Sequence, residues 1–158
     1  MQLRVDPRVT IDVLHPPRGL VPGVAPESND NSVVLNVTMG TVSLLLTGDI
    51  EEAGLPWLLD TGAVQGVTVL KVPHHGSRLG EAGARLFSEA RPHVAIVSVG
   101  RTHHLPSWQT MELAQRSGAV LLSTREDGAI QMRTDGRRLE IQTFRSRKRD
   151  VLMGGGRR

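Results

Sequence analysis

The chain has 158 residues, and its 39% hydrophobic content is enough for one domain with a real apolar core, which argues against intrinsic disorder. It has no cysteine, so disulfide bonds and thiolate metal ligands are excluded, and any metal would need His, Asp or Glu ligands. The net charge is +3, but residues 145–158 carry six Arg or Lys against one Asp, so the rest of the chain is slightly acidic. Attraction to a polyanion is therefore expected mainly from this tail.

The sequence shows neither a membrane span nor a secretory signal. No uninterrupted apolar run approaches the ~18 residues that a transmembrane helix needs. The first residues also lack the basic-then-apolar layout of a signal peptide. We therefore expect the chain as given to be soluble.

The first third of the chain is predicted to be mostly β-structure. Apolar residues alternate with polar ones over residues 9–13, which indicates a half-buried strand, and the Pro- and Gly-containing segment 15–31 indicates a loop. Segments 32–39 and 41–48 flank Gly40 and predict a hairpin. The stretch 50–63 is helix-like, but we expect Gly54 and Pro56 to break it.

From residue 67 onward, strands and helices are predicted to alternate. The expected strands are residues 67–72 and 93–100, and the expected helices are residues 80–90 and 107–118, the second opened by Ser107 and closed by Gly118. Continuous apolar character over 94–99 and 119–123 argues for strands covered on both faces.

The last part of the chain carries two dipeptides that favour tight turns. Asp127-Gly128 and Asp135-Gly136 lie within residues 119–144, so this segment predicts an antiparallel meander. Residues 145–158 are expected to be a basic, flexible tail. The fold class is therefore a mixed α/β (α+β) arrangement.

Three polar segments directly follow predicted strands. They are Thr47-Gly48-Asp49, His74-His75-Gly76-Ser77 and Thr102-His103-His104. Strand ends meet at one rim of an α/β sheet, which is where such proteins bind ligands. A carboxylate together with imidazoles suits zinc or manganese, and a bound metal lowers the pKa of its water, so hydrolysis is the natural chemistry.

Structural roles remain open for the same residues. Asp49 is equally suited to capping the following helix, with Glu51 and Glu52 at its positive end. Adjacent histidines on an extended backbone point in opposite directions, so only one of His74 and His75 is expected to face a given metal. A plain loop explains residues 103–104 as well as a site does. His15 and His93 are expected to be structural.

Four segments in order carry a resemblance: LLLTGDIEEA, VLKVPHHGS, VAIVSVG and DGAI. They resemble the C-terminal half of the metallo-β-lactamase-fold domain of ComEC-type competence proteins, and VLHPP and NDNSVVL upstream fit the same pattern. The match covers roughly residues 9–144. It implies a sandwich of mixed β-sheets with outer helices and a two-metal centre. Residues 1–144 would then be a partial domain of this type, followed by the basic tail 145–158.

The resemblance also implies roles for individual residues. Asp49 corresponds to the carboxylate shared by the metals, Zn²⁺ or Mn²⁺, and His75 to a histidine ligand, because it precedes a small residue and a hydroxyl. His74 becomes an outer neighbour. Where the family commonly has Gly-His-Pro after the VSVG strand, this chain has His104-Leu105-Pro106, with the histidine displaced by one position. His74 and His104 are then candidates for phosphate contact or proton transfer. Arg125 and Arg145 would either hold a nucleic-acid backbone or lie on a solvated surface.

One part of the family pattern is missing. The element His-x-His-x-Asp-His, which lies upstream of TGD in the superfamily, is absent from this sequence. We therefore expect only the C-terminal half of the domain, with weak or absent metal binding by the isolated chain. Apolar faces left open would lead to self-association or to contact with a chain carrying the missing half.

The expected function is phosphodiester hydrolysis of DNA by a nuclease-like segment linked to DNA uptake, within a bacterial membrane-associated protein. A second hypothesis is a non-catalytic module that assembles with a membrane channel and uses the basic tail as an electrostatic contact. A third is a small-molecule phosphodiesterase or esterase, because a fold alone does not set the substrate.

Overall fold

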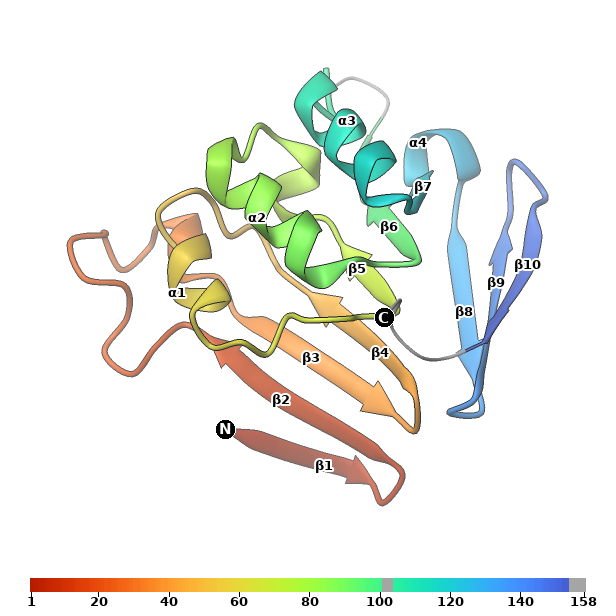
Figure 1. Ribbon diagram of the computed structural model, residues 1–158, viewed down its shortest axis with the longest axis horizontal. Coiled ribbons are helices and arrows are strands. Elements are labelled where there is room, and N and C mark those ends of the chain that lie inside the picture. The colour runs from red at the N-terminus through yellow and green to blue at the C-terminus, as the bar shows by residue number, and fades with distance from the viewer. Residues whose placement is uncertain (101–103, 154–158) are drawn as a thin grey trace.

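Two β-sheets packed face to face, with helices on one outer side, make up the computed structural model, which describes residues 1–100 and 104–153 (Figure 1). The larger sheet has seven strands in chain order: β1 Gln2–Asp6, β2 Val9–His15, β3 Val34–Met39, β4 Val42–Leu46, β5 Val69–Lys71, β6 Val94–Val97 and β7 Val120–Ser123. The smaller sheet has the order β10-β9-β8: β8 Ile130–Thr134, β9 Arg138–Thr143 and β10 Arg149–Met153. The expected mixed α/β sandwich is confirmed.

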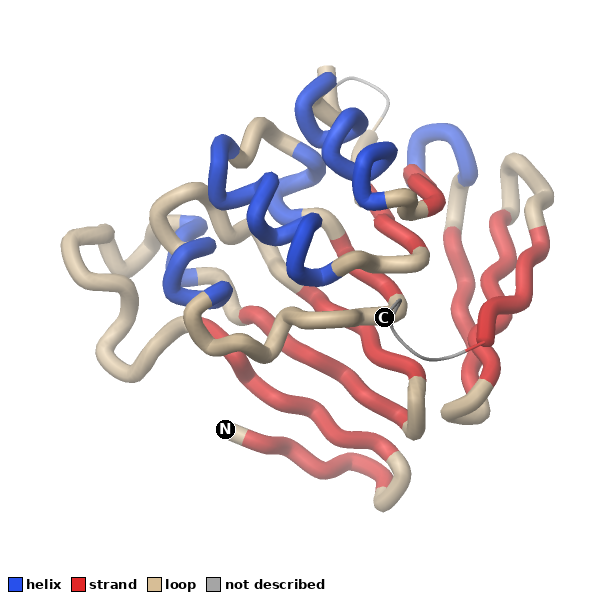
Figure 2. The backbone as a smooth tube through the Cα atoms, in the orientation of Figure 1, coloured by secondary structure: helices blue, strands red, loops and turns tan. Residues whose placement is uncertain are grey.

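The helices are short. The helical elements are α1 Leu55–Leu59, α2 Gly80–Ala90, α3 Trp108–Ser117 and α4 Thr124–Asp127, with 3₁₀ turns η1 Asn29–Asn31 and η2 Pro73–Gly76. Helices α1, α2 and α3 lie on one side of the larger sheet, and α4 lies at its edge, between β7 and β8 (Figure 2). Within the described part of the chain, no helix is long and apolar enough to cross a bilayer.

The larger sheet changes direction at β4. Strands β1 to β4 pair antiparallel, whereas β4 to β7 pair parallel. Parallel neighbours need crossover connections, and α2 and α3 provide two of them, between β5 and β6 and between β6 and β7. As a result, the carboxyl ends of β4, β5 and β6 lie along the same edge of the sheet.

Two apolar layers hold the sandwich together. The first lies between the larger sheet and the helices and includes the fully buried Leu45, Leu70 and Phe87. The second lies between the parallel strands and the smaller sheet. Its buried members are Val42, Val69, Val94, Ile96, Leu122, Leu139 and Ile141.

Polar contacts at two places join the two sheets. At the turn between β8 and β9, the carbonyl of Gly136 accepts from the Thr41 N–H at 2.7 Å and from Thr41 Oγ1 at 3.1 Å. At the end of α4, the buried Asp127 accepts from Ser146 Oγ at 2.6 Å and lies 3.0 Å from Lys148 Nζ. Both contacts anchor the smaller sheet to the larger one.

The same face of the larger sheet continues over β2 and β3 without such a cover. The strand register places a set of apolar side chains on the side that Leu44 shares with the second layer: Val9, Ile11, Val13, Leu35, Val37 and Met39. These six side chains are half-buried, and none of them belongs to either core layer of the described residues. We call this surface the open half-face.

Three local predictions need correction. Pro56 does not break the helix but lies in its first turn, where its missing N–H is not needed. Asp127-Gly128 is not a hairpin turn, because Asp127 ends α4 and Gly128 follows it. Consequently β7 belongs to the parallel sheet, and the meander begins only at β8.

The chain ends also differ from the sequence-based prediction. The sequence analysis assigns no element to residues 2–6, where β1 pairs with β2. Residues 149–153 lie within the predicted flexible tail, but they form β10 on β9. The reason is that Leu152 packs on the second apolar layer while the Arg149 guanidinium pairs with Glu140. Residues 154–158 lie outside the described residues.

Candidate functional site

Three loops meet at the carboxyl ends of β4, β5 and β6, as the strand order requires. They are residues 47–49, the turn Pro73–Gly76 and residues 98–100. Thr47 ties the first two together, because its Oγ1 donates to the Lys71 carbonyl at 2.7 Å. The predicted rim therefore exists, and it carries Asp49, His74 and His75.

Asp49 and His75 face each other across this rim. Asp49 Oδ2 lies 3.6 Å from His75 Nε2, while His75 Nδ1 lies 2.7 Å from the carbonyl oxygen of Ser98. A carbonyl only accepts hydrogen bonds, so the proton of the neutral ring belongs on Nδ1, and Nε2 presents its lone pair toward the carboxylate. A backbone carbonyl on one ring nitrogen is the usual way to orient a histidine that binds metal through the other.

The spacing of this pair fits a shared cation. A zinc ion ~2.1 Å from both atoms would place them ~3.4 Å apart at a tetrahedral angle. A catalytic zinc, however, normally has three protein ligands. No group of three or more His, Asp or Glu side chains suited to a metal occurs among the described residues. Among the described residues, Asp49 and His75 therefore offer a cation two side-chain ligands at most.

The alternative role of Asp49 as a helix cap is wrong. Helix α1 begins only at Leu55, with Gly54 as its N-cap and no acidic residue in its first turn. A different carboxylate holds this segment, since Asp30 Oδ1 accepts from the Gly54 N–H at 2.7 Å and from the Glu51 N–H at 3.1 Å. The Asp49 carboxylate is thereby left at the rim.

Lys71 supports the loop that carries Asp49. Its ammonium donates to the carbonyls of Gly48 at 2.9 Å and Val72 at 3.3 Å, and it lies 3.7 Å from Asp49 Oδ1. Burial lowers the pKa of Lys71, and the nearby Asp49 carboxylate opposes that shift. Sequence reasoning missed this residue, although it lies just three positions before His74.

His74 belongs to a second acid–imidazole pair. Its Nδ1 lies 2.7 Å from Glu51 Oε1, which also accepts from Asn29 Nδ2 at 3.0 Å. The His74 and His75 ring centroids are 6.2 Å apart, so the two pairs are neighbours. His74 thus contacts Glu51 and lies beside the Asp49–His75 pair. Its partner Glu51 was missed, because the sequence assigned that residue to a helix end.

The two histidines do not lie on an extended backbone, contrary to the prediction. His74, His75 and Gly76 have φ values of 40°, 54° and 80°, three consecutive left-handed residues. Only Gly adopts this region without strain, and each histidine there costs about 1–2 kcal/mol. Packing enforces the turn: a Cβ on Gly76 would lie 2.7 Å from Pro106 Cβ, and the Gly76 carbonyl accepts from the Ser107 N–H at 2.7 Å.

The remaining predicted residues lie away from the Asp49–His75 pair. His104 is exposed and lines a hollow of about 460 Å³ together with Arg125 and Lys148. Arg125 donates to the carbonyls of Leu105 and Gly100, so it holds the chain after β6. His103 lies outside the described residues.

Two other expectations concern structural positions. The Arg145 guanidinium donates to the Arg125 carbonyl, so Arg145 also contacts backbone. His15 is 1% exposed and its Nδ1 lies 2.9 Å from the Ser32 carbonyl oxygen, which confirms its structural role.

A hollow of about 420 Å³ adjoins His75. It is lined by His75, Ser98, Val99, Gly100, Leu105 and Thr124. Only His75 among these is ionisable, and a cavity of this size admits part of a substrate rather than a whole polymer. The hollow thus offers a place beside His75 in which a reacting group can lie.

The fold and this rim define a mixed α/β sandwich protein with a carboxylate–imidazole site at the ends of its parallel strands. No family model matches the sequence. Curated relatives do match. The chain is 35% identical to ComE operon protein 3 of Bacillus subtilis over 69% of its length, and 35% identical to Recombination protein 2 of Haemophilus influenzae over 75%. It is 32% identical to Competence protein ComA of Neisseria gonorrhoeae over 66%.

These matches relate the chain to one part of ComEC-type competence proteins. The aligned parts span only 14%, 15% and 16% of the three relatives. The predicted resemblance to ComEC-type competence proteins is thereby confirmed.

Proposed function

We propose that this chain is the segment of a metal-dependent phosphodiester hydrolase that supplies Asp49 and His75 to a Zn²⁺ or Mn²⁺ site and acts on DNA during competence. The observation that carries the proposal is the 3.6 Å spacing of Asp49 Oδ2 and His75 Nε2, with His75 Nδ1 fixed by a backbone carbonyl. The names of two relatives, which refer to competence and to recombination, support DNA as the substrate.

Each residue of the rim has a task in this proposal. A bound divalent ion supplies an activated water and neutralises charge on a phosphoryl oxygen. Asp49 and His75 hold such an ion, and Ser98 fixes the imidazole. Lys71 keeps the Asp49 loop in place and lowers the net negative charge at the rim. His74, paired with Glu51, is the group placed to accept or donate a proton.

Because two ligands are too few for a catalytic zinc, we propose that the other ligands come from a further polypeptide segment. The relatives are much longer than this chain, which leaves room for such a segment in the same protein. One observation also favours the second hypothesis, a non-catalytic assembly module. Among the described residues, no third His, Asp or Glu side chain joins Asp49 and His75 to complete a metal site.

Calorimetric titration with Zn²⁺ and with Mn²⁺ tests the metal site. We expect weak binding of one ion by the chain, reduced at least tenfold by Asp49→Asn and by His75→Gln. Asp60→Asn is the matched control, since Asp60 is an exposed carboxylate that pairs with Arg85 on the helical side. Equal affinity for all four proteins would refute the assignment.

A nuclease assay separates enzyme from module. The chain, alone and mixed with the upstream segment of a relative, is incubated with DNA and Mn²⁺. Cleavage that Asp49→Asn abolishes and Asp60→Asn preserves supports the hydrolase. No cleavage in any mixture, despite intact metal binding, supports the module.

A further inference from the structure

Charge is divided unequally between the two parts of the sandwich. Residues 130–153, which form the smaller sheet and its turns, carry seven Arg or Lys against three Asp or Glu. Residues 1–129 carry ten against thirteen. The smaller sheet is therefore basic while the rest of the molecule, including the proposed metal site, is acidic. A polyanion would be attracted to the smaller sheet first.

The strands hold part of this charge on one flat surface. Side chains alternate along β8, β9 and β10, so Leu139, Ile141 and Leu152 face the second apolar layer. Arg133, Arg138 and Arg149 occupy the opposite, solvent-facing side. We call this side the outer face.

The register places further polar groups between these arginines. Gln131, Gln142 and Arg149 form one row across the three strands, and Arg133, Glu140 and Val151 form the next. The Gln side chains add amide donors, and Glu140, which pairs with Arg149, is the one acidic side chain within these two rows. All three arginines are exposed, so their guanidinium groups are accessible to a ligand.

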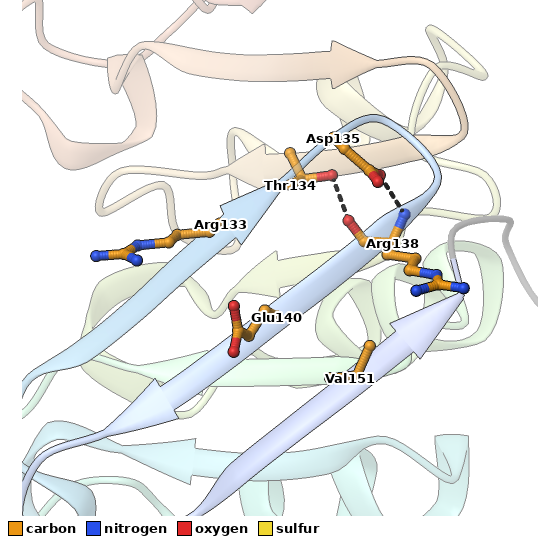
Figure 3. A pocket seen from close by; sticks show the side chains of 6 residues that line it. All are labelled: Arg133, Thr134, Asp135, Arg138, Glu140 and Val151. Atoms are coloured by element: carbon orange, nitrogen blue, oxygen red, sulfur yellow. Dashed lines mark hydrogen bonds between the residues drawn. The ribbon is translucent and has the colours of Figure 1, made fainter.

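The outer face is hollowed rather than convex. A depression of about 410 Å³ lies at the turn end of β8 and β9. Figure 3 shows its lining side chains, with Arg133 and Arg138 pointing to opposite sides of Glu140. Thr134, Asp135 and Val151 complete its lining. The Asp135 carboxylate is occupied by the backbone N–H groups of Arg137 and Arg138, at 2.8 Å each, so it faces the turn.

We infer that the outer face of the smaller sheet binds the phosphate backbone of a nucleic-acid strand. Guanidinium groups form paired hydrogen bonds with phosphate oxygens, and an open sheet face is wide enough for an extended strand. The two rows carry no aromatic side chain for base stacking, so the contact is to phosphates and is independent of base sequence. The choice of a nucleic acid over other polyanions rests on the proposed function. The outer face is a different surface from the proposed metal site, so the two can be tested separately.

Fluorescence anisotropy with a labelled single-stranded DNA of 20 nucleotides tests this surface. The buffer contains EDTA, so neither metal binding nor hydrolysis enters the measurement. The test variant carries Arg133→Gln, Arg138→Gln and Arg149→Gln. The matched control carries Arg85→Gln, Arg91→Gln and Arg116→Gln, which removes the same charge from the helical side.

We expect the sheet variant to bind at least tenfold more weakly, and the control variant to stay within about threefold of the original chain. The slope of log affinity against log salt should fall by about 2 in the sheet variant, since each lost phosphate contact removes ~0.7 for a single strand. Equal weakening by both variants would overturn the proposal in favour of a net-charge effect.

Three further measurements separate DNA binding from misfolding, from membrane binding and from the metal site. Arg133→Gln alone should lower affinity by about threefold or more; because Arg133 forms no ion pair within the described part of the chain, this change does not threaten folding. Tighter binding to phosphatidylserine vesicles than to the oligonucleotide would overturn the assignment in favour of a membrane. Asp60→Asn, which changes a carboxylate away from both surfaces, should bind DNA as the original chain does. Because EDTA removes metal ions from this assay, failure of the hydrolase proposal would leave the result unchanged.

Discussion

One face of the larger sheet is built in two different ways. Over the parallel strands, Val69, Val94 and Leu122 are nearly inaccessible because the smaller sheet packs on them. Over the antiparallel strands, the open half-face carries side chains of the same chemical type at half-burial. Composition does not distinguish the two halves. The smaller sheet packs on the parallel half and does not cover the antiparallel half. The burial of these side chains is therefore set by the packing of the two sheets and not by the sequence of each strand.

The largest expected contrast comes from the same substitution in the two halves. Ile96→Ala, in the parallel half, removes a side chain that is 9% exposed and leaves a cavity, so we expect a loss of about 2–5 kcal/mol in the free energy of unfolding. Ile11→Ala on the open half-face should lose about 1 kcal/mol or less, because less contact area disappears. Urea denaturation measures both. Similar losses would show that the open half-face is covered in solution.

The next contrast concerns the contact at Gly136. A Cβ on Gly40 would lie 2.3 Å from the Gly136 carbonyl oxygen, so Gly40→Ala must displace the smaller sheet. We expect a loss of about 2–3 kcal/mol from overpacking and from the φ of +56°. Gly62→Ala is the control, with a similar φ of +68° and open space around the added Cβ; it should lose about 1 kcal/mol. If both lose the same amount, the contact with Gly136 contributes nothing.

Asp127 gives a smaller effect that depends on pH. Burial disfavours its ionised form, but hydrogen bonds from Ser146, the Ser123 N–H and Lys148 prevail, and the pKa of Asp127 lies below its ordinary 3.8. Because the pKa is lower in the folded state than in the unfolded state, ionised Asp127 stabilises the fold at pH values above the unfolded-state pKa. This stabilisation is lost as the pH falls through the folded-state pKa. Asp127→Asn should therefore cost about 2 kcal/mol at pH 7 and less at pH 3. A pH-independent difference between the two proteins would contradict this.

The smallest effect on stability is expected on the open half-face itself. Val13→Thr with Val37→Thr keeps the side-chain shape and makes the surface more polar, so we expect less than about 1 kcal/mol change per site. We expect a clear decrease in self-association, measured by sedimentation velocity at several concentrations. If the original chain is monomeric at every concentration and the substitutions change nothing, the expectation that the open half-face contacts a partner is wrong.

Local signals in the sequence were sufficient for most elements of the sandwich. Helix α3 was bounded correctly because Ser107 accepts from the Thr110 N–H and Gly118 adopts the left-handed conformation that ends a helix. The tight turn predicted at Asp127-Gly128 was wrong, because the same dipeptide is also typical of a helix end. The strand β10 was missed because its basic composition indicated solvation, while its stability depends on Leu152 and on pairing with β9.

For the site, sequence order identified the strand ends and the family segments, and hence Asp49 and His75. It did not identify Lys71, Ser98 or Glu51. Each of them contacts a residue that is distant in the sequence, namely Gly48, His75 and His74, so only the folded structure brings the partners together. The left-handed turn at His74 was likewise invisible, since tertiary packing around Gly76 enforces it.

The hydrogen bond between Thr41 and Gly136 spans 95 residues along the chain. Closing so large a loop is entropically costly, and contacts of this kind slow folding. The β1–β2 and β3–β4 hairpins close over the short turns 7–8 and 40–41, so we expect them to form early, and the smaller sheet to dock last. Pulse-labelling hydrogen exchange would show this order as late protection of β8 to β10, and it implies that the basic surface is acquired only in the final step of folding.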